Sequence, residues 1–148
     1  MSQDVYARIE AASRSGVAAV YLRQPYDATG LEGFNHRLQS ELGEKSAEWY
    51  LSLLGLTDGL QIDNSLFESA HDFIETNLEH RAMDPVFNRY LIFGHGGNVD
   101  MYVYDKERAE QQFCVVGFYS VKDVYEEYSS IEELLVRLLN AESGDAVS

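Results

Sequence analysis

Residues 90–119 constrain the fold of this chain more than any other segment, because they predict three consecutive antiparallel strands. Strand-forming apolar and aromatic side chains fill residues 90–93, 99–104 and 113–119. Residues 94–98 read Gly-His-Gly-Gly-Asn, and the glycines of such a turn allow positive φ at several positions. We therefore expect a β-meander in the second half of the chain.

Helical patterns surround this meander. Apolar residues recur at helical spacing in residues 3–12 and 31–42. Three further helices are expected to begin at the N-caps Ser46, Ser69 and Ser130. The helix after Ser46 is apolar around nearly its whole circumference, which predicts that it lies centrally in the core.

The remaining patterns complete an α+β fold. Residues 60–67 predict a short strand pair with Asp63 and Asn64 at the bend, whereas periodicity leaves residues 17–22 unassigned. Helices, short strands, a helix, antiparallel strands and a last helix follow one another, an order typical of an α+β domain. We expect one domain over residues 1–140 and a disordered tail over residues 141–148. The residues expected in its core are Phe34, Leu38, Trp49, Leu53, Leu91, Phe93, Val103, Val115, Leu134 and Leu138.

The chain is strongly acidic, with a formal net charge of −14. Residues 41–85 hold ten acids and two bases, and residues 121–148 hold seven acids and two bases. Such a surface repels nucleic-acid phosphates and anionic lipid, and it favours a basic protein partner. Acidity that serves only solubility is the alternative.

Residues that carry catalysis or bind metals show no matching pattern in the sequence. His36, His71, His80 and His95 are scattered without metal-ligand spacing, and the Gly-rich segment beside His95 has no Gly-x-Ser-x-Gly nucleophile to accompany it. Cys114 lies within an apolar strand, where a core thiol is the usual role. We expect no catalysis, no cofactor and no metal site.

The cellular location is also predicted from simple features. A lone cysteine is typical of a reducing compartment, and the N-terminal residues lack the basic flank of a signal peptide. No apolar run reaches the ~18 residues of a membrane span. These features predict a cytoplasmic protein.

Acidic and aromatic residues next to turns and helix ends are the candidates for partner contact, because side chains there project from rigid elements. A face that only meets solvent is the alternative for the acids. The candidates are Asp58, Asp63, Asp100, Asp105, Asp123, Glu126, Glu127, Tyr125 and Tyr128. Tyr125 and Tyr128 are expected at the surface. For Tyr102 and Tyr104 two interpretations stay open: they belong to a mixture of tyrosines and carboxylates at an interface, or they form one strand face beneath a helix.

Three segments together resemble the SUKH superfamily of Smi/Knr-like proteins. The helix after Ser46 ends in Thr-Asp-Gly-Leu at residues 57–60, residues 93–105 join a Gly-rich turn to an aromatic strand, and residues 129–135 read Ser-Ser-Ile-Glu-Glu-Leu-Leu. The resemblance spans residues 31–140 and looks closest to the small bacterial YrhA family. Residues 1–30 match no part of it.

The resemblance implies a single α+β domain and a binding role. Many bacterial SUKH proteins are immunity proteins that bind and block a cognate toxin, frequently a nuclease. The acidic charge fits a basic nuclease, whose cationic surface otherwise meets phosphate. The alternative is an intracellular adaptor or regulatory protein of the same fold without a link to a toxin.

Overall fold

The computed structural model describes residues 3–15, 19–45, 47–97 and 100–143. Within these residues seven antiparallel strands form one sheet, ordered as in the sequence. The strands are β1 (Val20–Leu22), β2 (Leu60–Ile62), β3 (Ser65–Phe67), β4 (Tyr90–His95), β5 (Asp100–Asp105), β6 (Phe113–Gly117) and β7 (Val124–Tyr128). The predicted α+β class, strand pair and meander are confirmed.

Two strands are additions to the prediction. β1 comes from the unassigned apolar run and pairs with β2. β7, with the sequence Val-Tyr-Glu-Glu-Tyr, pairs with β6 at the edge of the sheet, where adjacent glutamates obscure the strand pattern. The prediction that the third meander strand continues to Tyr119 is wrong, because β6 ends at Gly117.

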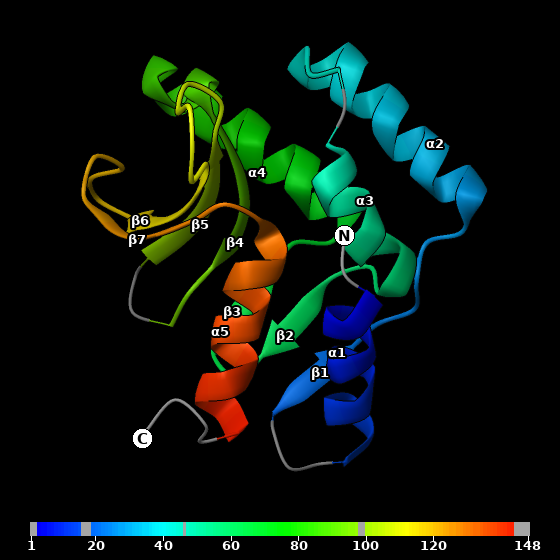
Figure 1. Cartoon of the computed structure of the whole chain (residues 1–148). Coiled ribbons are helices and arrows are strands. Elements are labelled where there is room, and N and C mark those ends of the chain that lie inside the picture. The colour runs from blue at the N-terminus through cyan, green and yellow to red at the C-terminus, as the bar shows by residue number, and fades with distance from the viewer. Residues whose placement is uncertain (1–2, 16–18, 46, 98–99, 144–148) are drawn as a thin grey trace.

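Five α-helices occur in the described residues, as predicted: α1 (Gln3–Ser15), α2 (Ala28–Arg37), α3 (Glu48–Leu56), α4 (Ala70–Met83) and α5 (Ile131–Ser143). A π-helical turn, Leu38–Leu42, extends α2, and a 3-10 helix, Pro85–Arg89, follows α4. Figure 1 shows α1 and α5 side by side near the β1–β3 part of the sheet, with α2 and α4 above them. The last three residues of α5 overlap the expected tail, whose other residues, 144–148, lie outside the described ranges.

The helix ends follow from capping chemistry. Ser69 Oγ accepts a hydrogen bond from Asp72 N over 3.2 Å, as predicted, and Ser130 Oγ likewise accepts one from Glu133 N. α2 begins earlier than predicted, because Asp27 Oδ1 accepts a hydrogen bond from Gly30 N. For α3 the N-cap is Ala47, and the expected cap, Ser46, lies outside the described residues.

The main core fills the space between the helices and one face of the sheet, and a smaller core covers part of the other face. Most of the residues predicted for the main core lie there. Val103 is buried in the smaller core, because strand alternation turns it away from Tyr102 and Tyr104. Trp49 and Leu138 are only partly buried, which corrects two predictions, and Leu139 is buried on α5 instead.

Gly94 belongs to β4 and not to the turn that the sequence suggested. A bulge interrupts the pairing of β4 with β5 between Ile92 and Gly94. A Cβ atom at Gly94 would lie 2.6 Å from Leu66 O and 2.9 Å from the Tyr102 ring, so the glycine permits close approach of β3. Among the described glycines only Gly43 and Gly59 have positive φ, so Gly94, Gly96 and Gly97 do not adopt the positive φ that a glycine allows.

Helix α4 takes the place of a strand along part of β4. β3 pairs with β4 only at Gly94 and His95. Beyond them, Asn77 Nδ2 donates to Ile92 O over 2.9 Å, and Ile92 N donates to Asn77 Oδ1 over 2.8 Å. Arg81 Nη2 donates to Tyr90 O over 3.0 Å. These contacts fix α4 against the sheet and satisfy backbone groups that would otherwise be buried without partners.

Candidate functional site

Asp105 is a structural residue in this fold. Only 3% of it is exposed, and Arg89 holds it in a two-point ion pair with Nε–Oδ1 and Nη2–Oδ2 distances of 2.7 and 2.8 Å. Hydrogen bonding to Asp105 raises the pKa of Arg89. The expectation that the Asp105 side chain projects from the surface is therefore wrong, because the residue is buried and its carboxylate is held by Arg89.

Asp58 and Asp100 are half-buried. Asp58 Oδ1 accepts a hydrogen bond from Ala70 N over 2.8 Å, so it ties the end of α3 to the start of α4. Asp100 Oδ1 is buried and accepts no hydrogen bond from the described residues. A small cavity of about 200 Å³ is lined by Asp100, Ser65 and Tyr102, and the last two form a hydrogen bond of 2.6 Å between Ser65 Oγ and Tyr102 Oη.

The two glutamates of β7 are each paired with an arginine. Glu126 contacts Arg137 of α5 at 3.3 Å between Oε1 and Nε, and it also accepts a hydrogen bond from Tyr128 Oη. Glu127 accepts one from Arg108 over 2.5 Å. Both glutamates therefore help to hold β7 against its neighbours.

The two tyrosines of β7 differ in exposure. Tyr125 is 61% exposed, as predicted. Tyr128 packs against the main core and is half-buried, which corrects the expectation of exposure. Burial, together with the hydrogen bond to Glu126, raises the pKa of Tyr128 to about 12. Tyr102 and Tyr104 both face the main core, and the ring of Tyr104 stacks on Trp49 of α3, so the interpretation that they pack beneath a helix is the one that the structure supports.

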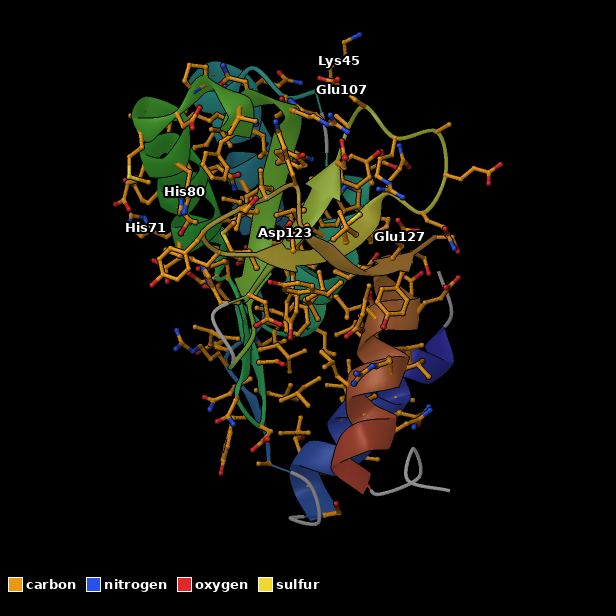
Figure 2. The ribbon with its side chains drawn as sticks, turned by 90° about the vertical axis from the view of Figure 1, so that its left-hand side faces the viewer. Lys45, His71, His80, Glu107, Asp123 and Glu127 are labelled. Atoms are coloured by element: carbon orange, nitrogen blue, oxygen red, sulfur yellow. The ribbon has the colours of Figure 1, made fainter. Side chains whose placement is uncertain are left out.

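Asp63 and Asp123 are the predicted acids that stay exposed without an ion pair in the described chain. Asp63 occupies the β2–β3 turn with φ of 52°, and Asp123 lies just before β7. Figure 2 shows Asp123 and Glu127 separated along the β7 region. The nine candidates are thus spread over several elements and do not form one acidic face.

Most of the basic residues form ion pairs with carboxylates of the same chain, so unpaired carboxylates outnumber unpaired cations at the surface of the described residues. Arg37, Arg81, Arg89, Arg108 and Arg137 all bind carboxylates within the chain. The exposed acids that have no cationic partner in the described ranges are Asp27, Glu32, Glu48, Asp63, Asp72, Glu79, Asp84, Glu110, Asp123 and Glu133. The net charge of −14 is therefore carried largely by carboxylates that face solvent.

Two histidines and Cys114 could in principle take part in catalysis, but contacts or burial within the fold account for them. His95 Nδ1 lies 2.9 Å from Glu68 Oε1, a pair that the sequence did not predict because its members are far apart in the chain. His80 Nδ1 lies 2.8 Å from Thr76 O. Cys114 is buried as predicted, and burial raises the pKa of its thiol. No group of three or more metal-ligating side chains gathers in the described ranges.

Exposed apolar side chains gather near the end of α4, which the sequence did not predict. Met83, Phe118 and Tyr119 are 71, 42 and 89% exposed. The available signal was the pair Phe118-Tyr119 immediately before Ser120, but the strand pattern of residues 113–119 concealed it. Tyr21 and Leu66 are exposed apolar residues on β1 and β3.

Comparison with family models and with curated proteins gives no match to this chain in sequence. No helix in the described ranges has both the length and the apolar character that a membrane crossing requires.

Proposed function

We propose that this chain is a non-catalytic protein-binding module that engages a basic protein partner, as an immunity protein engages a toxin. The observation that carries the proposal is the surplus of solvent-facing carboxylates left after the internal ion pairs are formed. Exposed charges of one sign produce the long-range field that attracts an oppositely charged protein. Such a field speeds encounter and opposes binding to nucleic acid.

The resemblance to SUKH immunity proteins supports a toxin as the partner. A toxin that cleaves nucleic acid has a cationic surface, and an acidic protein seated on it would exclude the substrate. The carboxylates require no catalytic geometry for this role, only a rigid support, and the α4–β4 contacts supply one.

The test begins with the tagged full chain in its native cells. Proteins captured with it are identified, and the principal one is purified and titrated calorimetrically against the chain. The proposal predicts a basic partner that binds stoichiometrically, and whose toxicity in a host cell is suppressed when the chain is co-expressed. A basic partner without toxicity would assign the chain to the adaptor class instead, and a partner that is acidic or a nucleic acid would refute the proposal.

A further inference from the structure

A surface cavity lies between the C-terminal end of α4, the 3-10 helix that follows, and the loop between β6 and β7. Its volume is about 670 Å³, within the range of ~300–1,000 Å³ typical of ligand pockets. Met83, Phe87, Phe118 and Tyr119 supply much of its apolar wall. His80 of α4, another lining residue, is labelled in Figure 2 on the same side of the molecule as Asp123.

Met83, Phe118 and Tyr119 of the apolar wall are exposed to solvent and are not packed in the core. Phe118 and Tyr119 contact each other with ring centroids 5.2 Å apart, and His80 contacts Phe87 at 5.0 Å. Met83 beside them is largely exposed. A contiguous exposed group of Met, Phe and Tyr side chains is typical of a protein interface, because these residues lose water readily when a partner covers them.

The cavity stands on a rigid base. Val121 lines it and belongs to the smaller core, on which Phe87 also packs. The β6–β7 loop is closed by two backbone hydrogen bonds, from Gly117 N to Asp123 O over 3.0 Å and from Asp123 N to Ser120 O over 2.9 Å. A partner would therefore meet a wall that is already in place, which lowers the entropy cost of binding.

The charge around the cavity specifies the partner. Asp84 lines it, Glu79 stands one turn before Met83 on α4, and Asp123 closes the β6–β7 loop. None of these three acids forms an ion pair with another described residue, and Lys122 is the cation that lines the cavity. A two-fold dimer through this surface would place one net-acidic surface against another, which is unfavourable. A partner with an apolar side chain flanked by cations would bury the apolar wall and pair with the three acids.

We infer that this cavity seats an apolar anchor side chain of a basic protein partner, with the anchor's neighbouring cations meeting Glu79, Asp84 and Asp123. The inference rests on the proposed function and names the surface through which it acts. Tyr119 would contact the anchor directly, because it is the most exposed member of the wall.

The test uses the full chain and three labelled synthetic peptides of equal length. The first is Lys-Lys-Leu-Trp-Leu-Lys-Lys, the second replaces its apolar centre by serines, and the third replaces its lysines by glutamates. We expect only the first to bind, as measured by fluorescence anisotropy, and its NMR titration to shift signals of Met83, Phe118 and Tyr119. Equal binding of the serine peptide, no binding of the first, or shifts confined to other elements would overturn the inference.

Variants of exposed residues then locate the contact without a risk to folding. Tyr119→Ala should weaken binding of the first peptide at least about tenfold, the effect of losing an interface anchor. Tyr21→Ala removes a matched exposed tyrosine from β1 and should change affinity less than about twofold. An equal effect of the two variants contradicts the inference. Concentration-dependent dimers that Tyr119→Ala abolishes would assign the surface to a second copy and also overturn it.

The captured natural partner separates the two proposals. If a basic partner binds Tyr119→Ala and the unaltered chain with equal affinity, the cavity is not its contact surface, but the proposed function stands. If the chain captures no basic partner, the proposed function fails even where the peptide binds.

Discussion

Asn77 shows at the scale of one residue how a side chain can replace a neighbouring strand. Its amide donates to and accepts from the backbone of Ile92, where β3 no longer covers the edge of β4. The same amide donates to Phe73 O over 2.8 Å. All of these groups are buried, so no water stands ready to replace the asparagine.

Asn77→Ala should therefore lower the free energy of unfolding by about 2–4 kcal/mol, because two backbone groups of Ile92 lose their partners. Urea denaturation followed by circular dichroism measures the loss. Asn88→Ala is the matched control, since Asn88 is exposed in the 3-10 helix. A loss below about 1 kcal/mol would show that the edge of β4 is satisfied in another way.

The sequence predicts single residues well where periodicity governs them, and poorly where pairing does. Phe34, Leu53 and Phe93 follow the helix and strand periods and are buried as expected. Asp105 and Glu126 look like surface acids in the sequence, because their partners, Arg89 and Arg137, are 16 and 11 residues away and lie on other elements. Only the folded chain brings such partners together.

Helix α3 is the central helix at the scale of elements, and Trp49 joins it to the sheet. The Trp49 ring stacks on Tyr104 at 5.1 Å and meets Phe113 and Phe93 edge-on at 5.1 and 5.3 Å. Part of the ring reaches solvent because its large side chain spans from the core to the surface. The apolar composition of this helix predicted its central position, but not how far each side chain is buried.

Trp49→Ala should lower the free energy of unfolding by about 3–5 kcal/mol, since it removes the ring that fills the space between α3 and the sheet. Circular dichroism is the appropriate probe, because the substitution removes the chain's one tryptophan. Trp49→Phe keeps part of the ring and should lose less. If Trp49→Ala costs under about 1 kcal/mol, α3 is not central to stability.

Strand β7 is an element that the alternation of apolar and polar residues did not predict. Two adjacent glutamates break the alternation that identified β4–β6, yet β7 forms because Glu126 and Glu127 find arginines and Tyr128 packs inward. Sequence patterns are equally limited for the candidate site. The sequence shows where acids and tyrosines occur. It does not show the cavity, because the wall is formed by the end of α4 and the β6–β7 loop, which are far apart in the chain.

For the whole molecule, tyrosines that the fold buries fully or in part predict sensitivity to alkali. Burial raises the pKa values of Tyr90, Tyr102 and Tyr128, the last to about 12. An unfolded tyrosine titrates near pH 10, so between about pH 10 and 12 the unfolded chain binds fewer protons than the folded one. The stabilisation is complete below about pH 10 and is lost as pH rises through the folded pKa values.

The free energy of unfolding should therefore fall steadily as pH rises from about 10 to 12, as urea titrations across this range would show. Tyr128→Phe removes one titrating group and should make the decline shallower. A stability that does not vary with pH over this range would mean that these tyrosines are not held neutral by the fold.

The central claim is that the surplus acid surface draws a basic protein to this chain, and the rate of association with the captured partner tests it most directly. Stopped-flow measurements should show the association rate constant falling at least about tenfold as salt rises from about 0.05 to 0.5 M, because ions screen charges beyond ~10 Å at about 0.1 M. Joint Glu79→Lys and Asp123→Lys substitution should slow association more than Glu32→Lys and Glu48→Lys, a matched pair of reversals on α2 and α3, and should change dissociation little. An association rate that ignores both salt and these reversals would contradict the claim.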